Sequence, residues 1–600
     1  MLAAQHVEDE AGNHQRGDHG GYIQNAAQAF PPLALRVEKD LPVGHERSLL
    51  TPARRSRKKA TATPRGGSGR TSEGRANLRK CRRLYSTNRM EAGRESQSIE
   101  GAAGRVRSAL AVVLPLVAGL ALRLWMLKKL FYVNGDMLVY GDLGKNLLLH
   151  GRFALTGDGG QVVPTLIRLP GYPLFLALCF KVFGMENYFA AACVQIALDL
   201  LGCLLVAGFV RRIVPAHGQA AARITLWLAA LCPFTASYAI LPLAEGPTLF
   251  MLALAMWAMA RFREDPDWGN ALWFTFAVTA ATLLRPDGAL AAIAFAPAMF
   301  LELRTNWELG FRGFPLFRKR RERMGHGQIR AGQGTGATSM ARMAAVCVLL
   351  ALSPFAAWTA RNWRVFHVFE PLAPRLAIDP GENPDLGWER WVKSWCLDFI
   401  STYEIYWNVP GDKLEVSALP SRAFDTPAQY AETVALADDY NGNMDITPEM
   451  DARFERLAEE RIAVHPLRYY LWLPLGRVAD MGLRPRIENL PIDLDWWVYA
   501  HHHAETEFSW AYAGLNALYL LLAIAGLWLR PRFWWALLAY MVLRGALLWT
   551  VEAPETRYTL ECFPMLFALG GVAISRLIDR PYLSKLKAVF GSGSFTLMLE

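Results

Sequence analysis

Long apolar runs separated by short polar connections dominate the chain from about residue 107 onward. A bilayer core about 30 Å thick requires roughly 20 apolar residues in a spanning helix. The stretch 169–184 is apolar but contains Gly and two Pro residues and is too short to span, so we expect a helix at the outer interface. The remaining runs predict ten membrane spans, near residues 107–127, 188–210, 222–241, 246–261, 268–284, 287–303, 343–360, 508–528, 533–550 and 558–577.

The first hundred residues have a different pattern. Residues 1–105 are rich in Gly, Arg, Ser and Ala and lack apolar periodicity, which predicts a disordered basic tail in the cytoplasm. Two other interpretations remain open for this tail. It is either a polybasic segment that touches anionic lipid or nucleic acid, or the product of a misassigned translation start with the true start near Met90.

The rest of the chain is predicted to form membrane and outer parts in turn. Residues 106–360 form an N-terminal membrane core whose first outer loop covers 128–187. A small α or α/β outer domain follows at 361–506, then C-terminal membrane helices at 507–580 and a cytoplasmic tail at 581–600. The predicted fold class is an all-α polytopic membrane protein with about ten transmembrane helices and one interfacial helix.

Basic residues orient the predicted spans. Lys and Arg concentrate in connections that stay in the cytoplasm. Placing the N-terminus inside puts 211–223, 260–268 and the loop 304–342, with its RKRRER run, in the cytoplasm. This predicts a multi-pass protein of the cell (inner) membrane. The Lys128–Lys129 pair is an exception to the charge rule.

Composition and charge exclude several other classes. Hydrophobic residues make up 52% of the 600 residues, which disfavours a soluble enzyme. The net charge of +10 arises almost entirely in residues 1–107, with 20 Lys and Arg against 11 Asp and Glu, whereas the remainder has 44 against 43. The basic charge therefore does not indicate binding to nucleic acid. The eight Cys are scattered and imply no disulfide framework.

Polar chemistry gathers first in the predicted outer loop. Apolar residues at helical spacing within 135–155 predict an amphipathic helix on the membrane surface. Asp136 and Tyr140 are four residues apart and would share one face of it, with Asp142 close behind. A carboxylate there suits a general base at the boundary of water and lipid, and the alternative is an ordinary solvated acid.

Charged residues also mark other membrane edges. Arg168 opens RLPGYP (168–173), where it could hold a lipid phosphate or snorkel to the headgroups. Glu245 lies between two predicted spans. An acid at that depth suggests function, although the helix dipole also favours an acid at a helix N-terminus.

Arg557 and Tyr558 precede the last span. Arginine suits phosphate through its bidentate fork, while an ion pair with Glu552 or Glu555 is the alternative.

Three further features have simpler interpretations. Asp287 lies in LLRPDGAL, which predicts a type I turn with a local ion pair to Arg285. Asp199 is in the middle of a span, so it must face a cavity or pack against a partner on another helix. The histidines at 501–503 are consecutive and cannot all face one metal ion. The sequence also lacks a P-loop, a GxSxG and an HExxH motif.

Taken in order, these pieces resemble the GT-C membrane glycosyltransferases, in the group related to protein O-mannosyltransferases and lipid A aminoarabinose transferases (glycosyltransferase family 39 and relatives). The resemblance covers about 105–580. Its elements are Asp136 and Tyr140 with the NLL–G–F stretch that follows, RLPGYPLFLALCFKVFG (168–184), LAEGPTLFMLALAMW (243–257), LLRPDG (283–288), WTARNWRVF (358–366), ERIAVHPLRYYLWLPLGR (460–477) and PETRYTLECFPMLFAL (554–569).

The resemblance implies transfer of a sugar from a polyprenyl-phosphate donor to an acceptor hydroxyl at the outer face. Asp136 would be the catalytic base, and Glu245 a second catalytic acid that positions the acceptor or the sugar. The implied acceptor is a glycan, lipid or protein, within the membrane lipid. Metal use varies across the superfamily, so no metal is assigned and a divalent ion stays open. The implied substrate-binding residues are Tyr140, Asp142, Arg168, Tyr172, Asp287, Arg557 and Tyr558.

Two departures from the family pattern bear on these roles. Many relatives have paired acids at the first-loop site, whereas Asp136 here stands between Gly135 and Met137, with Asp142 as a possible substitute. Gly246 separates Glu245 from Pro247, where relatives often have Pro directly after the acid.

Two rival functions remain at this stage. A transporter or flippase of lipid-linked sugars would need charged or broken helices near the midplane and internal repeats, of which only Asp199 is present. A polysaccharide polymerase or ligase would share the donor and the outer loop, so the sequence separates it poorly from a glycosyltransferase.

Overall fold

The computed structural model describes residues 106–157, 159–215, 217–309, 333–498 and 501–578. It divides into two units, Met1–Ala109 and Leu110–Glu600, and the packing below is that of the second unit. The predicted N-terminal tail (1–105), the RKRRER run and the tail 581–600 lie outside the described residues.

Helices form most of the described chain, as predicted. The first is Val106–Leu130. A short antiparallel hairpin, β1 (Ala154–Thr156) and β2 (Val162–Pro164), closes the first loop. The longer helices are α3 (Asp136–His150), α4 (Gly171–Phe183), α5 (Tyr188–Ile213), α6 (Gly218–Ala230), α7 (Pro233–Ala239), α8 (Glu245–Glu264), α9 (Trp268–Leu284), α10 (Ala289–Leu309), α12 (Gln333–Phe366), α13 (Leu386–Lys393), α15 (Pro427–Asn441), α16 (Pro448–Val464), α17 (Leu473–Leu483), α18 (His503–Trp528), α19 (Trp534–Leu548) and α20 (Phe563–Ile578).

Local sequence signals start and break these helices. The Asn187 side chain accepts a hydrogen bond from the Ala190 amide at 3.0 Å and caps α5, and Asp267 caps α9 in the same way. Pro233 cannot donate a backbone hydrogen bond, and α6 and α7 meet there at a bend of 56°. The predicted span 222–241 is therefore a broken helix.

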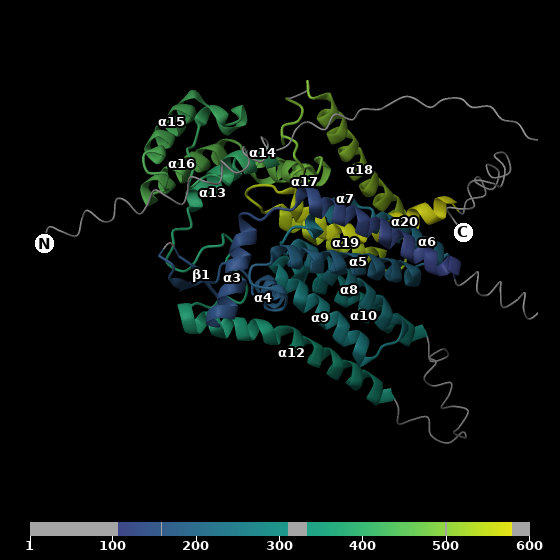
Figure 1. Cartoon of the computed structure of the whole chain (residues 1–600). Coiled ribbons are helices and arrows are strands. Elements are labelled where there is room, and N and C mark those ends of the chain that lie inside the picture. Colours follow the sequence, from purple (N-terminus) through teal and green to yellow (C-terminus); the bar gives the residue numbers. More distant parts are fainter. Residues whose placement is uncertain (1–105, 158, 216, 310–332, 499–500, 579–600) are drawn as a thin grey trace, which may run out of the picture. The chain divides into compact units, whose positions relative to one another are not determined.

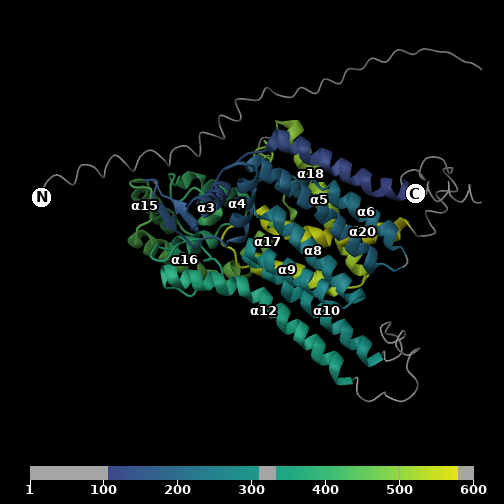
Figure 2. The ribbon, with the colours of Figure 1, turned by 60° about the horizontal axis from the view of Figure 1, so that its bottom comes forward.

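The membrane helices pack side by side around two buried members. Helix α8 contacts α5, α9 and α10, and α20 contacts α18, α6 and α5 (Figures 1 and 2). Apolar side chains from these helices form one continuous core. The interfacial helix predicted at 169–184 is α4, which packs against α3, α5 and α9.

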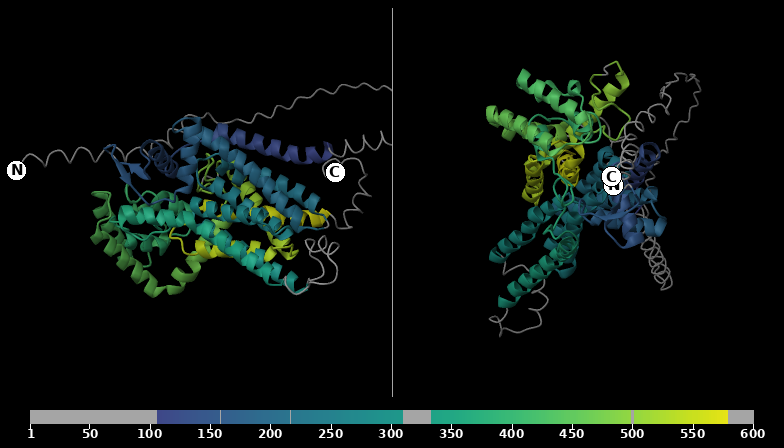
Figure 3. Two further views of the ribbon diagram at one scale, coloured as in Figure 1. Left: turned by 90° about the horizontal axis from the view of Figure 1, so that it is seen from below. Right: turned by 90° about the vertical axis from the view of Figure 1, so that its left-hand side faces the viewer.

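The segment predicted as an outer domain has its own helices and its own core. Helices α13, α15 and α16 lie together in the green part of the ribbon (Figure 3). Their core is built around Trp388, Trp391, Trp395 and Phe454. No strand occurs among the described residues of 361–506, so the α option holds there and the α/β option is wrong.

The prediction of a polytopic all-α membrane protein is confirmed. Each of the ten expected spans falls on one helix or, at 222–241, 287–303 and 558–577, on two successive helices. Among the described residues, five helices are long and apolar enough to cross a bilayer, or six if the bent pair α6–α7 is one span. Helices α9 and α19 have 17 and 15 residues, which gives lengths of roughly 25 and 22 Å at 1.5 Å per residue, shorter than the bilayer core.

The mid-span acid has a partner on another helix. Asp199 in α5 accepts a hydrogen bond from Arg123 Nε at 2.6 Å, and both side chains are buried. Arg123 Nη1 also donates to the carbonyl of Ala230 at 2.7 Å, so the pair joins the first helix to α5 and α6. Asp199 therefore has a structural role between helices.

Breaking this pair should destabilise the bundle. We expect Asp199→Ala to cost about 3–5 kcal/mol, because it leaves the Arg123 guanidinium buried without a counter-ion. The double variant Arg123→Met/Asp199→Leu should recover most of the loss. Thermal unfolding in nanodiscs measures both, with Glu264→Gln at a half-exposed ion pair as the control. A double variant as unstable as the single one would contradict the pairing account.

Candidate active site

Charged side chains from six separate chain segments meet at the end of the bundle where α8 begins. These segments are the start of α3, the turn before α4, the start of α8, the turn after α9, helix α19, and the strand-like entry into the 3-10 helix η6 (Thr556–Cys562). We call this group the charge cluster. Its members are Asp136, Arg168, Glu245, Arg285, Asp287, Arg544, Glu555, Arg557 and Glu561.

Asp136 lies between two arginines. Its Oδ1 accepts from Arg168 Nη2 at 2.7 Å, and its Oδ2 accepts from Arg557 Nη2 at 3.2 Å. The three side chains are 29%, 24% and 20% exposed respectively, so solutes can reach this edge of the cluster. The first residue of a helix in the first loop is thus joined to residues 32 and 421 positions away.

These ion pairs set the acidity of Asp136. Burial alone would raise the pKa of its carboxyl group, but Arg557 and Arg168 outweigh that effect and lower the pKa to about 2. The carboxylate is charged at neutral pH. In this paired state it is also a weak base, because a proton would have to compete with two guanidinium groups.

Arg557 connects Asp136 to the deeper acids. Its Nε forms a short ion pair with Glu555 and lies 3.9 Å from Glu245 Oε1. Glu245 is only 2% exposed and accepts from Arg285 Nη1 at 2.6 Å. The predicted second acid is therefore fully engaged with arginines, and its burial argues against direct contact with a substrate.

The deepest part of the cluster is an arginine–carboxylate lattice. Arg285 Nε lies 3.0 Å from Glu561 Oε1. Arg544 donates to Glu561 Oε2 at 2.8 Å and pairs closely with Asp287. The expected local pair between Arg285 and Asp287 exists at 3.5 Å, but Arg544 is the nearer partner. Arg544 and Glu561 are nearly inaccessible and Arg285 and Asp287 are mostly buried, and their ion pairs join η6 to α19 and to the turn before α10.

Tyrosines line the reachable edge. Arg168 stacks over the Tyr140 ring at 5.9 Å, and Tyr140 meets Tyr172 edge to face at 4.9 Å. The Tyr172 hydroxyl donates to Gln195 at 2.6 Å, and that of Tyr558 donates to Glu555. Burial raises the pKa of Tyr140 to about 12, so its phenol stays protonated at neutral pH. Tyr140 can donate a hydrogen bond but is not a base.

Asp142 is the one predicted site residue that the structure places elsewhere. Its carboxylate accepts from the Thr156 amide at 2.6 Å and the Thr156 hydroxyl at 2.9 Å, and pairs with Lys145 at 2.9 Å. It fastens the β1–β2 hairpin to α3 and belongs to no ion pair of the charge cluster. The prediction that Asp142 binds substrate or replaces Asp136 therefore finds no support, because its oxygens are occupied by the hairpin.

Four members of the cluster, Arg285, Arg544, Glu555 and Glu561, were not predicted as site residues, and Arg285 appeared only as the local ion-pair partner of Asp287. Arg544 sits in the apolar helix α19, where an isolated charge is costly, and that cost was the available signal. Glu555 and Glu561 flank Arg557 in the sequence, and Glu555 appeared there only as an alternative ion-pair partner. Their roles depend on partners from other helices, which no local pattern reveals.

The acids of the cluster do not form a metal site. Among the described residues, no group of three or more His, Cys, Asp or Glu side chains is arranged to hold a metal ion. The carboxylates of the cluster pair with arginines instead. The histidines at 501–503 belong to no such group either.

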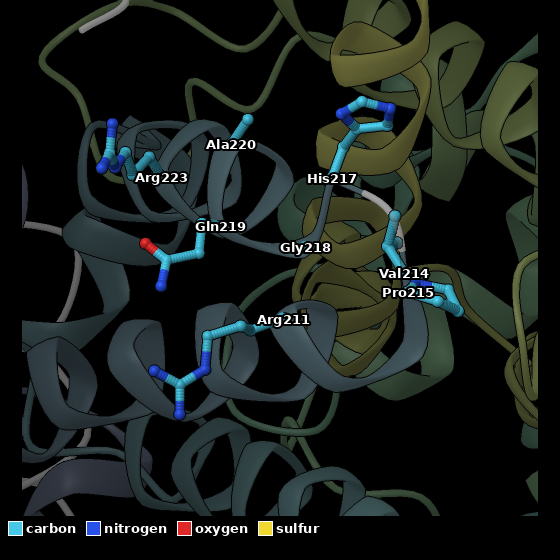
Figure 4. Close-up of a pocket in the computed structure, with 8 residues that line it drawn as sticks. All are labelled: Arg211, Val214, Pro215, His217, Gly218, Gln219, Ala220 and Arg223. Atoms are coloured by element: carbon cyan, nitrogen blue, oxygen red, sulfur yellow. The ribbon is translucent and has the colours of Figure 1, made fainter.

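A separate cavity of about 450 Å³ lies at the C-terminal end of α5, near the end of α8 that is opposite the cluster. Figure 4 shows Arg211, Gln219 and Arg223 gathered at one side of it. These arginines come from the connection predicted to be cytoplasmic. The distribution agrees with basic residues at one membrane face and the charge cluster at the other.

Contacts also tie the helical segment after α12 to the cluster. Lys393 donates to the Thr550 carbonyl at 2.6 Å, and Thr402 donates to the Pro554 carbonyl at 2.9 Å, just before η6. Nearby, the Tyr406 hydroxyl donates to Glu389 Oε1 at 2.9 Å. Burial raises the pKa of Glu389 to about 7, which makes it a group that titrates near neutrality beside the loop leading to Arg557.

Comparison with known protein families supports the resemblance described above. A family model described as dolichyl-phosphate-mannose-protein mannosyltransferase matches residues 164–309, less than half of the chain. This confirms the resemblance for the part that contains RLPGYP, Glu245 and LLRPDG. Asp136 and Arg557 lie outside the matched part. No curated protein sequence matches the chain.

The solved structures that match this chain are distant from it in sequence. The oligosaccharyltransferase AglB from Archaeoglobus fulgidus, in complex with an inhibitory peptide and a dolichol-phosphate, is 12% identical with a TM-score of 0.43, over 81% of this chain and 52% of that one. ArnT from Cupriavidus metallidurans, bound to undecaprenyl phosphate, is 15% identical with a TM-score of 0.32, over 80% and 79%. The chain thus spans about half the length of the archaeal enzyme.

The raised pKa of Glu389 predicts a pH effect on stability. Its folded value of about 7 exceeds the ordinary 4.5, so the stabilisation is fully present below the unfolded value and is lost as pH rises through the folded one. Between about pH 5 and pH 8, the melting temperature of wild type should fall relative to that of Glu389→Gln. The exposed control Glu415→Gln should track wild type. Parallel curves for wild type and Glu389→Gln would refute the assignment.

Proposed function

We propose that this protein is a membrane glycosyltransferase that moves a sugar from a polyprenyl-phosphate carrier to an acceptor hydroxyl at the outer membrane face. One observation carries the proposal. A carboxylate at the accessible edge of the charge cluster is held by two arginines from different segments, at the ends of membrane helices. The two arginines can bind a phosphate, and the carboxylate can remove a proton beside it.

The two arginines suit a lipid phosphate. Arginine presents a planar fork of donors that matches phosphate oxygens, and it stays charged at any physiological pH. Arg168 lies before the interfacial helix α4, and Arg557 opens the last membrane segment. A phosphate on a lipid tail in the outer leaflet would reach this level. In the structure, the Asp136 carboxylate occupies the anion position between the two arginines.

The proposed reaction begins when the donor phosphate binds Arg168 and Arg557 in place of the Asp136 carboxylate. Asp136 then loses its strongest partners and gains proton affinity. It removes the proton from the acceptor hydroxyl, and the hydroxyl oxygen forms a bond to the anomeric carbon of the sugar. The bond from that carbon to the phosphate oxygen breaks, and its electron pair leaves with the polyprenyl phosphate. Arg168 and Arg557 balance the charge that grows on the leaving group. Attack opposite to the leaving group inverts the anomeric configuration.

The charge balance of the cluster favours this order of steps, in which donor binding comes before proton removal. Five acids face four arginines, so the cluster has no spare positive charge. An added phosphate makes the site more negative, and a more negative site binds a proton more tightly. The cluster thus links donor binding to the basicity of Asp136, its reachable acid.

The buried acids act by positioning. Glu245 holds Arg285 and lies beside Arg557, so we assign it to fixing the arginines and not to contacting the acceptor. Tyr140 and Tyr558 form an aromatic wall next to these arginines, suited to a sugar ring or the first isoprene unit, and the buried Tyr172 packs against Tyr140. Asp287 supports this wall through Arg544.

The acceptor side faces the segment 361–506. Its helices contact the loop before η6, so this segment would shape the choice among glycan, lipid and protein hydroxyls. The sugar is a hexose or pentose. Because Lys and Arg concentrate on the cytoplasmic side of membranes, we assign the C-terminal end of α5 to the cytoplasm, with the N-terminus, and the cluster to the outer face of the inner membrane. The mid-span acid that a transporter would require is neutralised by Arg123, so we propose no transport function.

Turnover of a lipid-linked donor tests the reaction. With purified protein in nanodiscs and a panel of radiolabelled polyprenyl-phosphate hexoses and pentoses, Asp136→Asn should lower sugar release by about 10²–10⁴-fold, the usual contribution of a general base. The exposed Asp438→Asn in α15 should match wild type. Unchanged turnover in Asp136→Asn would remove Asp136 as the base. Absence of turnover in wild type with every donor would overturn the glycosyltransferase proposal.

Binding of the carrier tests the shared anion position without turnover. Asp136→Asn should bind polyprenyl monophosphate about tenfold more tightly, because the competing carboxylate is gone, and tenfold is roughly 1.4 kcal/mol. Arg168→Gln and Arg557→Gln should each bind it more weakly, while the exposed Arg456→Gln should not change. Titration in nanodiscs followed by native mass spectrometry measures the affinities. Equal affinity in wild type and Asp136→Asn would show that the carboxylate and the phosphate use different positions.

A further inference from the structure

An uncovered apolar face follows α16 in residues 361–506, which we call the outer segment. It consists of Leu467, Tyr470, Leu471, Trp472, Leu475 and Leu483, which are between 39% and 66% exposed. They lie on the π-helical turn Arg468–Trp472 and on α17. We call this the apolar face. It occurs inside the segment whose polarity predicted a domain standing in water.

The apolar face is one side of a two-sided helix. Leu467, Leu471 and Leu475 recur every four residues and are exposed. Leu473, Arg477 and Met481 recur with the same spacing, offset by two residues, and are buried. An offset of two residues is close to half a helical turn. The buried stripe therefore packs on the protein, and the apolar stripe points away from it.

Hydrogen bonds fix the level of this helix relative to the membrane helices. Asn516 Nδ2 donates to the Gly482 carbonyl at 2.8 Å, at the end of α17. Asn516 is the fourteenth of 26 residues in α18, a helix long and apolar enough to span. At 1.5 Å per residue it lies roughly 20 Å from His503, near the middle of that helix. The end of α17 therefore reaches the depth of the membrane spans.

Two further contacts agree with this level. Trp549 Nε1 donates to the Tyr470 carbonyl at 3.2 Å, directly after α19. Thr559 Oγ1 donates to the Met481 carbonyl at 3.2 Å, near the start of the last membrane segment. The helix is thus tied along its length to the middle of α18 and to the ends of two other membrane segments.

We infer that residues 464–483 enter the outer leaflet of the membrane from its interface, with the apolar face in lipid. Large exposed Leu side chains belong among acyl chains, and Tyr and Trp favour the level of the headgroups. Like the apolar face, α18 carries large exposed leucines, and Leu518 and Leu521 are 50% and 63% exposed. The occupant is the bilayer itself, and the helix anchors the outer segment to it beside the charge cluster.

The polar side of the helix supports the same orientation. Arg477 is fully buried and donates to the carbonyls of Lys393 and Cys396 at 3.0 and 2.9 Å, within the outer segment. Arg468 pairs with Asp425 through two contacts of 2.6 Å. Both cations are directed into the protein, so no charge is left on the apolar face to oppose its insertion.

Site-specific photocrosslinking tests the inference. The full chain carries p-benzoylphenylalanine at Leu467 or Leu475 and is placed in nanodiscs of phosphatidylethanolamine and phosphatidylglycerol. After irradiation and delipidation, mass spectrometry should find phospholipid adducts at both positions, several-fold above the yield at Tyr430, an exposed residue of α15. Leu521 on α18 serves as the lipid-facing reference.

The outcomes separate lipid from other occupants. Adducts at Leu521 but none above the Tyr430 level at Leu467 and Leu475 would overturn the inference. Adducts to a second copy of the chain at Leu467 and Leu475 would overturn it as well and would identify the face as an oligomer interface. All four positions are exposed in the structure, so the probe replaces no buried contact. The result does not depend on whether the protein transfers a sugar.

Discussion

The need to neutralise buried charge governs this structure. A guanidinium or carboxylate at the end of an apolar bundle is costly unless it is paired and hydrogen-bonded. Arg285 and Arg544 meet this requirement with Glu561, and Arg544 extends it to Asp287. Because the partners come from α19, η6 and the turn after α9, satisfying the charges also fixes the relative positions of these elements. The geometry of the accessible edge rests on this inner lattice.

The lattice changes character from its buried side to its reachable side. Glu245 and Glu561 are inaccessible and are committed to arginines. Asp136, Arg168 and Arg557 are partly exposed and can exchange partners with a ligand. Strong pairing lowers the proton affinity of Asp136, so the same contacts that order the site also suppress its basicity. In the proposed reaction, the anionic donor relieves this suppression at the moment when a base is needed.

Membrane placement connects the outer segment to this chemistry. Its helices are fastened to the loop before η6 by Lys393 and Thr402. The apolar face of α17 would hold the segment against the lipid from the other side. A segment fixed at both points cannot rotate freely over the cluster, and a fixed position allows it to shape the approach of an acceptor. Glu389, which titrates near neutrality, lies in this fastened region.

The sequence by itself determined the helical membrane class and most of the candidate residues. Run length alone located the helices, because the bilayer thickness constrains spanning segments whatever their partners. The sequence singled out Glu245 by the cost of charge near a membrane, Asp136 by its place on an amphipathic helix, and Arg557 by its place before the last span. It did not show that Asp142 belongs to the hairpin, that Arg544 completes the lattice, or that α17 turns an apolar face outward. Those features depend on which distant segments meet, and pairing between residues hundreds of positions apart leaves no local pattern. Only the tertiary structure decided them.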